Sequence, residues 1–335
     1  MKKKPARACT INAPCKINLH LRIGEKRPDG FHSLESIFAS LALADTLRFD
    51  CAGKEGDSVL STNWEIPQHE CPEEPIPPEK NLVLRAISLF RDRTGFNSAL
   101  KIRLDKRIPT GSGLGGGSSD AASTLLALNS LISAPLPMEE IKTMAALLGS
   151  DVPFFLTGGA AFVSGRGELI ESVKSPAGLW VVLLKPPFSS DTARAYRLLD
   201  EARAREKAKE AEESFSKEKT PSEALMGEEL SKKALIRALE EAPEAWPFRN
   251  DFLPVLPGLI KGEQKTKAGI YMALLQAFRE ADACFAGLSG SGSCCFGVFS
   301  AKEAAKKAVK ALSMQGNYAR LTFFLAHKAK AVLEY

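Results

Sequence analysis

The first regular pattern in the chain is an alternation of apolar and polar residues between Ala8 and Ile23. Successive side chains of a β-strand point to opposite faces, so the pattern predicts a strand, a turn and a second strand. After Pro14 the alternation is strict. One face of the second strand would carry Lys16, Asn18 and His20, and the other Ile17, Leu19 and Leu21. Without further information, this pattern is typical of a half-buried strand with a solvated polar face.

The same two periodicities predict the other elements. Strands are expected as two runs within Leu34–Asp50 and over Ala99–Leu104, Leu179–Leu184 and Arg320–Phe324. Helical spacing of apolar residues predicts helices over Asn81–Thr94, Ser119–Leu131, Met138–Leu148, Lys267–Ala281 and Ala301–Met314, and one that begins at Thr192. Asn81 is a typical N-cap, and Gly95 and Gly149 are typical helix ends.

Two segments are less regular. Residues 51–80 are rich in Pro, Glu and Gly, which predicts a mobile surface loop with one short strand. Within residues 201–245, the part from Glu201 to Thr220 is nearly all charge and alanine. This composition is typical of a solvated helix extension or of partly disordered chain, and it indicates no chemistry.

The most informative stretch is Ile108–Ser123, IPTGSGLGGGSSDAAS, which lies between a predicted strand and a predicted helix. Glycine lets the backbone approach a ligand closely, and the free N–H groups at a helix start attract phosphate. The stretch therefore predicts a phosphate-binding turn. A flexible linker is the alternative, but linkers rarely separate a clear strand from a clear helix.

Three common phosphate-binding turns fit poorly. The Walker pattern needs Lys after its last glycine, whereas Gly117 is followed by two serines. A G-x-G-x-x-G pattern is present, but Glu139 and Glu140, the acidic residues near the required distance, begin a helical pattern instead of ending a strand. The H-R-D and D-F-G motifs of protein kinases are missing.

Composition narrows the class of protein. The 335 residues suffice for two domains, with 44% hydrophobic and 25% charged residues, as in globular proteins. A net charge of +5 does not indicate a nucleic-acid surface. The seven cysteines form no C-x-x-C pair, and neither a signal peptide nor a membrane-spanning run is visible. We expect a cytoplasmic protein that binds neither nucleic acid nor membrane.

The glycine stretch resembles the second motif of the GHMP kinase superfamily, named after galactokinase, homoserine kinase, mevalonate kinase and phosphomevalonate kinase. Members carry Pro, a few residues, and then Gly-Leu-Gly-Ser-Ser-Ala. Here Pro109 precedes Gly113-Leu114-Gly115, and two further glycines stand before Ser118 and Ser119. This triple-glycine form is similar to one branch, whose substrate is 4-diphosphocytidyl-2-C-methyl-D-erythritol. The resemblance runs from about Asn12 to Phe299, outside residues 51–80 and 201–245.

Earlier motifs agree with the resemblance. Pro-x-Lys-x-Asn-Leu is the first motif of that branch, and it implies that Lys16 and Asn18 belong to the active site. In the Asp-Gly-Phe-His that follows, the family pattern implies that Phe31 stacks on cytosine and that His32 binds its edge. A second aromatic residue, for which Tyr196 is the candidate, would complete the sandwich. From the residues alone, Phe31 and His32 fit a hairpin with an aromatic plug about as well as a recognition site. Tyr196 likewise fits a tyrosine packed in the core about as well.

Asp151 precedes Val152-Pro153-Phe154, and proline is common in the first turn of a helix. Taken alone, Asp151 is therefore a helix N-cap. Leu-Gly-x-Asp-Val-Pro-Phe is also a signature of the resembled branch, which implies that Asp151 is the catalytic base. The two roles are compatible. A second glycine-rich stretch, Gly287–Phe296, resembles the third family motif, and a tight hairpin is its simpler interpretation.

The implied fold has two domains. Residues 1–173 would form an α/β ATP-binding domain that carries the glycine-rich loop, and residues 174–335 a ferredoxin-like α+β domain. ATP would be bound by Pro109, Thr110, Gly111, Ser112, Gly113, Leu114, Gly115, Gly116, Gly117, Ser118, Ser119 and Asp120. Mg²⁺ is expected with ATP; no acidic pair is evident for it, so the hydroxyl of Ser118 or Ser119 is the candidate ligand.

The implied reaction moves the γ-phosphoryl group of ATP to the 2-hydroxyl of 4-diphosphocytidyl-2-C-methyl-D-erythritol. Asp151 would accept the hydroxyl proton, and Lys16 would neutralise charge on the transferred group. The alternatives are another small-alcohol kinase of the superfamily, of mevalonate or homoserine type, and a non-catalytic nucleotide-binding protein. The active form would be a monomer or a homodimer.

Overall fold

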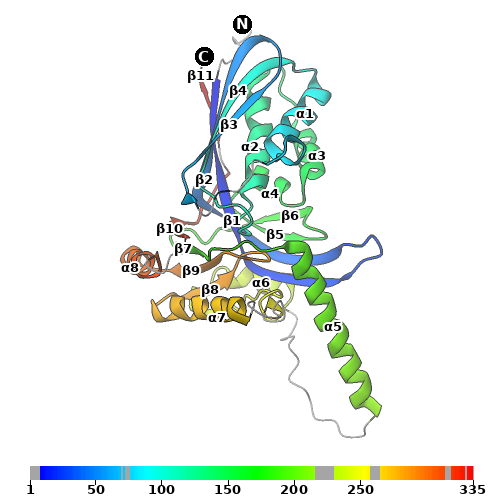
Figure 1. Cartoon of the computed structure of the whole chain (residues 1–335), viewed down its shortest axis with the longest axis vertical. Helices are drawn as coiled ribbons and strands as arrows, with labels where there is room; N and C mark the ends of the chain where they lie inside the picture. Colours follow the sequence, from blue (N-terminus) through cyan, green and yellow to red (C-terminus); the bar gives the residue numbers. More distant parts are fainter. Residues whose placement is uncertain are drawn as a thin grey trace.

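The computed structural model describes residues 8–68, 71, 76–215, 230–256, 265–313, 318–328 and 330–334. Two sheets lie one above the other in Figure 1, and the long hairpin of β1 (Ala8–Lys26) and β2 (His32–Glu55) runs through both levels. The predicted two-domain GHMP kinase fold is confirmed. The domain boundary near residue 173 stays a prediction.

The upper sheet has the order β11-β1-β2-β4-β3, with β5 paired to β2 and β6. Its remaining strands are β3 (Val59–Trp64), β4 (Ser98–Lys106), β5 (Ala160–Ser164), β6 (Leu169–Val173) and β11 (Val332–Glu334). One face is covered by α1 (Leu82–Thr94), α2 (Gly116–Leu131), α3 (Met138–Leu148) and α4 (Val152–Thr157) (Figure 1). Apolar side chains from the sheet and these helices, among them Phe49, Phe90 and Phe154, form the buried core between them.

The lower sheet has the order β10-β7-β9-β8, formed by β7 (Trp180–Lys185), β8 (Phe285–Leu288), β9 (Cys295–Phe299) and β10 (Tyr318–Phe323). All its pairs are antiparallel, which gives the predicted ferredoxin-like arrangement. Its helices are α5 (Thr192–Phe215), α6 (Lys232–Ala238), α7 (Lys265–Glu280) and α8 (Lys302–Ser313). In Figure 1, α5 extends away from the body beside the tip of the β1–β2 hairpin.

The prediction of a turn within Ala8–Ile23 is wrong, because β1 is one continuous strand. Its pairing with β2 shifts register between Pro14 and Lys16 and again between Asn18 and His20. Proline lacks an N–H donor, so a bulge lets the strand pass it without ending the ladder. The two runs predicted within Leu34–Asp50 are likewise parts of the single strand β2.

The solvated polar face predicted for β1 is also wrong. Lys16, Asn18 and His20 are buried, because the lower half of β1 lies between the two levels of the molecule. Burial, together with the positive charges of Arg249 and Arg22, lowers the pKa of His20 to about 4. Polar side chains buried this way need partners inside the protein.

Several local predictions are confirmed. The side chain of Asn81 accepts hydrogen bonds from the N–H groups of Val83 and Leu84, and Gly95 ends α1 in the left-handed conformation. The segment 51–80 contains β3 and a short 3-10 helix at Pro78–Lys80. Helix α5 continues to Phe215, and the rest of the charged stretch, from 216 to 229, lies outside the described residues. The sequence did not predict β11, which pairs with β1 beyond the strand expected to be last.

Candidate active site

The loop between β4 and α2, residues 107–115, is here called the glycine loop. Gly111, Gly113 and Gly115 have φ angles of 59°, 76° and 72°, which residues with a side chain rarely adopt. A Cβ atom at Gly113 would collide with the carbonyl oxygen of Ser289. The predicted strand, loop and helix are confirmed, although α2 begins at Gly116 instead of Ser119. Its first N–H groups have no intrahelical acceptor and can meet an anion.

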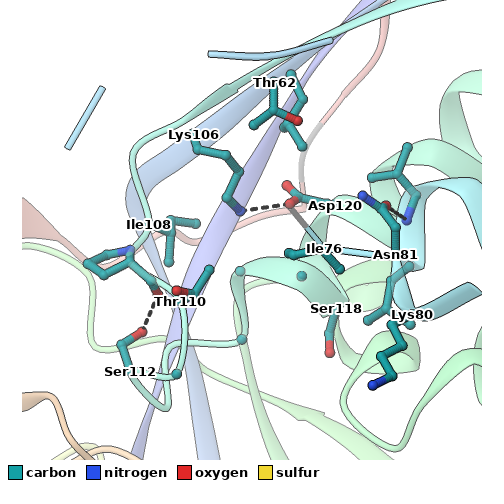
Figure 2. A pocket seen from close by; sticks show the side chains of 18 of the residues that line it. Thr62, Ile76, Lys80, Asn81, Lys106, Ile108, Thr110, Ser112, Ser118 and Asp120 are labelled. Carbon is teal, nitrogen blue, oxygen red and sulfur yellow. Dashed lines mark hydrogen bonds and ion pairs between the residues drawn. The ribbon is translucent and has the colours of Figure 1, made fainter. Parts of the chain in front are cut away.

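A pocket of about 350 Å³ adjoins this loop (Figure 2). Of the residues predicted to bind ATP, ten line it: Pro109, Thr110, Gly111, Ser112, Gly113, Gly115, Gly116, Gly117, Ser118 and Asp120. Leu114 points instead into an apolar cluster, where it is buried. Ser119 is buried too, and among the described residues its hydroxyl has no hydrogen-bond partner.

The opposite wall of the pocket was missed by sequence reasoning. Thr62 and Trp64 reach it from β3, and Ile76 and Lys80 come from later in the segment 51–80, which was expected to be a surface loop with one short strand. Asn81, Leu82 and Val83 contribute the start of α1. No local signal marks Thr62 and Trp64, because they meet the glycine loop only when β3 pairs in parallel with β4.

A buried ion cluster lies beside the pocket. Lys106 Nζ is 2.7 Å from Asp120 Oδ2 and also contacts Asp45, whose other oxygen accepts hydrogen bonds from the backbone N–H groups of Arg107 and Ile108. The pKa of Asp120 is raised to about 7. Burial is the largest cause, Asp45 adds to the upward shift, and Lys106 opposes it. Burial lowers the pKa of Lys106, but the two carboxylates outweigh this and the net shift is upward. Two carboxylates thus share one ammonium group.

Lys16 and Asp151 form a second lysine–carboxylate pair on the other side of the glycine loop. Lys16 Nζ is 3.4 Å from Asp151 Oδ2, and the Asp151 side chain is 34% exposed whereas that of Lys16 is buried. The backbone N–H of Lys16 donates to the carbonyl of Leu114 at 2.9 Å, which ties β1 to the loop. Asp151 occupies the predicted N-cap position of α4, but within the described residues its side chain makes no capping hydrogen bond.

Asn18 orients the lysine. Its Oδ1 accepts a hydrogen bond of 2.7 Å from Lys16 Nζ, and its Nδ2 donates to Ser36 Oγ at 3.0 Å. Because Asn18 is buried, its amide is held by these two contacts. The structure therefore brings together Lys16, Asn18 and Asp151, as the sequence predicts, with Asn18 directed at the lysine.

The second glycine stretch is both a hairpin and part of the site. It joins β8 to β9, and its residues bind the glycine loop directly: Ser289 Oγ donates to the carbonyl of Gly113 at 2.9 Å, and the Cys294 N–H donates to that of Ser112 at 3.0 Å. Asn250, which sequence reasoning did not place in the site, donates to the carbonyls of Leu288 and Gly290, both at 2.8 Å. The connection between β8 and β9 thus fixes the position of the glycine loop by hydrogen bonds.

The residues predicted to recognise cytosine are brought together only in part. The rings of His32 and Tyr196 stack, with centroids 5.0 Å apart and an interplanar angle of 25°. Phe31 is 55% exposed, and the Arg166 guanidinium lies 5.2 Å from its ring. Burial raises the pKa of Tyr196, and the negative charge of Asp151 adds to that upward shift, so the tyrosine lies within electrostatic reach of Asp151.

Metal ligands are sparse around the pocket. Within the described ranges there is no group of three or more His, Cys, Asp or Glu side chains that could hold a metal ion. Ser118 lines the pocket at the start of α2 and offers one hydroxyl oxygen (Figure 2). Mg²⁺ in proteins usually keeps several of its waters and binds to the phosphates of a substrate. A single hydroxyl oxygen from the protein therefore fits an Mg²⁺ ion that arrives with a nucleotide.

None of the helices described here is long and apolar enough to span a bilayer.

Comparisons with known proteins agree with this geometry. The family model described as GHMP kinases N terminal domain matches residues 81–159, and GHMP kinases C terminal matches residues 266–317. A solved structure of 4-(cytidine 5'-diphospho)-2C-methyl-D-erythritol kinase superposes with a TM-score of 0.68 at 29% identity, covering 97% of this chain and 98% of that one.

Curated relatives carry the same enzyme name. The chloroplastic 4-diphosphocytidyl-2-C-methyl-D-erythritol kinase of Oryza sativa subsp. japonica is 43% identical over 190 residues, 56% of this chain and 45% of that protein. The chain spans about half the length of the plant relatives it matches, from 45% to 50%. A kinase of that name from Synechococcus is 35% identical over 316 residues, 91% of this chain and 92% of that protein.

Proposed function

The chain belongs to the 4-diphosphocytidyl-2-C-methyl-D-erythritol kinase family of GHMP kinases, and from that premise we propose that it transfers the γ-phosphoryl group of ATP to the 2-hydroxyl of 4-diphosphocytidyl-2-C-methyl-D-erythritol. One observation supports this most directly. Lys16 and Asp151 meet at 3.4 Å beside the glycine loop, where a carboxylate and an ammonium group can act on the two partners of a phosphoryl transfer.

The nucleotide would lie between the glycine loop and the opposite wall of the pocket. The N–H groups at the start of α2 suit the phosphates, because the helix dipole is positive there. The apolar side chains of Ile76, Leu82 and Val83 suit a base. Mg²⁺ bound to the phosphates, with Ser118 as protein ligand, would offset charge on the phosphate oxygens.

Asp151 is the group that would accept the proton of the substrate hydroxyl. A positioned carboxylate assists a poor nucleophile by accepting its proton, and the Lys16 ammonium lies beside this carboxylate. Lys16 is itself oriented by Asn18, so its charge is fixed before substrate binds. The partial exposure of Asp151 leaves room for an alcohol to approach its carboxylate.

The substrate class follows from the groups near Asp151. His32 and Tyr196 form an aromatic surface within electrostatic reach of Asp151, which suits a nucleotide-linked alcohol better than mevalonate or homoserine. A non-catalytic nucleotide-binding protein would have no use for the Lys16–Asp151 pair. We also propose a cytoplasmic location, a domain boundary near residue 173, and a monomer or homodimer as the active form.

The test is an assay of ATP-dependent phosphorylation with three alcohols offered separately: 4-diphosphocytidyl-2-C-methyl-D-erythritol, mevalonate and homoserine. Release of ADP gives the rate, and ³¹P and ¹³C NMR of the product locate the new phosphate. We expect turnover of the first alcohol alone, with the phosphate on its 2-oxygen. Turnover of mevalonate or homoserine instead would contradict the proposed substrate, and ATP binding without turnover of any of the three would favour a non-catalytic role.

A further inference from the structure

The ring of His32 is held on two sides by helix α5. Its Nε2 lies 2.7 Å from Asp200 Oδ1, and its face stacks on Tyr196. Tyr196 in turn meets Phe252 edge-on, with centroids 5.0 Å apart. Since His32 is also buried, both the position and the orientation of its imidazole are determined by these contacts.

Asp200 occupies a fixed place on the same helix. Tyr196, Asp200, Arg203 and Lys207 are spaced by four, three and four residues, so they form one face of α5. That face meets the β1–β2 hairpin: Arg203 Nη1 donates to the carbonyl of Gly24 at 2.8 Å, and Lys207 Nζ pairs with Glu25 Oε1 at 3.1 Å. The second oxygen of Asp200 lies 3.8 Å from Lys26 Nζ. The helix and the hairpin therefore fix the carboxylate from both sides.

This geometry determines which ring nitrogen of His32 carries the hydrogen. An ionised carboxylate only accepts hydrogen bonds, so the Nε2 that faces Asp200 must donate. In a neutral imidazole the other nitrogen, Nδ1, is then left as an acceptor. Cytosine carries a 4-amino donor, whereas uracil carries a 4-oxo acceptor at the same position. An acceptor on His32 can pair with the first base and is mismatched with the second.

We propose that Asp200 is a positioning residue that fixes the tautomer of His32 and thereby makes the site select a base with an amino group at position 4. The proposal rests on the proposed function, since it assumes a substrate linked to a pyrimidine nucleotide. It assigns specificity to a residue that acts through the recognising histidine.

The first test needs no substrate. Nitrogen-15 NMR distinguishes protonated from bare imidazole nitrogens, and the signal of His32 among the four histidines is identified by its loss in His32→Gln. We expect the ring of the wild-type protein to carry hydrogen on Nε2 alone, and the ring of Asp200→Ala to become a mixture of tautomers. A wild-type ring protonated at Nδ1, or an unchanged spectrum in Asp200→Ala, would overturn the proposal.

The second test measures kcat/KM for the cytidine substrate and its uridine analogue. In Asp200→Ala we expect the preference for cytidine to fall roughly tenfold to hundredfold, the scale of the penalty for leaving a buried polar group unpaired. Asp200→Asn keeps an acceptor oxygen and should retain most of the preference. The matched control is Glu201→Ala, which removes an exposed carboxylate paired with Arg205 from the adjacent position, and it should leave the preference unchanged.

Lys26→Ala removes the other neighbour of Asp200 and should also leave the preference unchanged. If Asp200→Ala binds ATP normally but keeps the full preference, the inference is wrong while the proposed function stands. If the wild-type protein phosphorylates neither pyrimidine substrate, the proposed function fails, and the NMR experiment still decides the tautomer. If Asp200→Ala does not fold, the NMR spectrum of the wild-type ring carries the test, and hydrogen on Nδ1 of His32 would overturn the proposal.

Discussion

Two lysines lie against neighbouring glycines, the last of the glycine loop and the first of α2, and both face carboxylates. A Cβ atom at Gly115 would be 3.2 Å from Lys16 Cγ, and one at Gly116 would be 3.3 Å from Lys106 Nζ. Lys106 is enclosed with Asp45 and Asp120, all three of them buried. Lys16 faces a single carboxylate, Asp151, that remains open to solvent on one side.

The two lysine sites differ in their exposure to solvent and in how closely carboxylates surround the ammonium group. Lys106 Nζ approaches Asp120 Oδ2 to 2.7 Å and contacts Asp45 as well, whereas Lys16 Nζ and Asp151 Oδ2 are 3.4 Å apart. A buried, saturated ion cluster holds elements in place, and removing one member leaves an uncompensated charge. A looser and partly exposed pair can instead admit a substrate. The same residue types therefore serve the fold in one place and, under the proposed function, the chemistry in the other.

The largest effect is expected from Asp151→Asn. The amide cannot accept the hydroxyl proton, so kcat should fall by roughly two to four orders of magnitude, the usual contribution of a general base. ATP affinity and the free energy of unfolding should stay near wild-type values. Steady-state kinetics, ATP titration and urea unfolding measure the three quantities, with Glu139→Gln, an exposed carboxylate on α3, as control. Near-normal turnover would remove Asp151 from the chemistry.

The next effect is expected from Lys106→Met, which keeps much of the side-chain volume and removes the charge. Two buried carboxylates would then lack a counter-ion, and the free energy of unfolding should drop by about 3–5 kcal/mol. Urea unfolding at pH 7 measures this. Lys101→Met makes the same change at an exposed position of β4 and should cost much less. Equal losses in the two variants would show that the buried cluster does not stabilise the fold.

Lys16→Met tests the other lysine of the comparison, the one paired with Asp151. Its charge acts on the transferred group, so kcat should fall by roughly 10²–10³, as when one electrostatic transition-state contact is removed. ATP affinity should change less. In a double mutant with Asp151→Asn the losses should be far from additive, because the two residues act as a unit. A loss confined to ATP binding would make Lys16 a ground-state phosphate ligand.

The smallest effect concerns pH and Asp120. Its pKa is about 7 in the folded protein, above the value of roughly 4 for an unfolded chain. The unfolded chain therefore loses this proton first, and the folded state loses stability as pH rises from about 4 to about 7. Asn at this position does not titrate, so Asp120→Asn should remove this pH-dependent part of the stability loss.

Chemical denaturation of wild type and Asp120→Asn at pH 4.5 and 7.5 checks this expectation. Asp57→Asn neutralises an exposed carboxylate and should keep the wild-type pH dependence. If the wild-type protein and Asp120→Asn lose stability in parallel as pH rises, Asp120 is not the carboxylate that retains the proton.

The limits of sequence reasoning lie in long-range pairing. The cap of α1 at Asn81 was predictable because its partners, Val83 and Leu84, lie two and three residues away. The continuous course of β1 past Pro14 was not, since it depends on β2 accepting register shifts. For the site, the resemblance identified Lys16 and Asp151 together. Asp200 had no signal of its own, because His32 lies 168 positions away in the chain.

The sequence by itself determined the glycine loop between a strand and a helix, since glycine conformation and helix starts are local properties of the chain. It also placed Lys16 and Asn18 on one face of a strand. Only the tertiary structure decided that Lys16 is buried against Asp151 while Lys106 is locked between Asp45 and Asp120. The physical reason is that the charge state and reach of a side chain depend on solvent access and on neighbours brought in by distant segments.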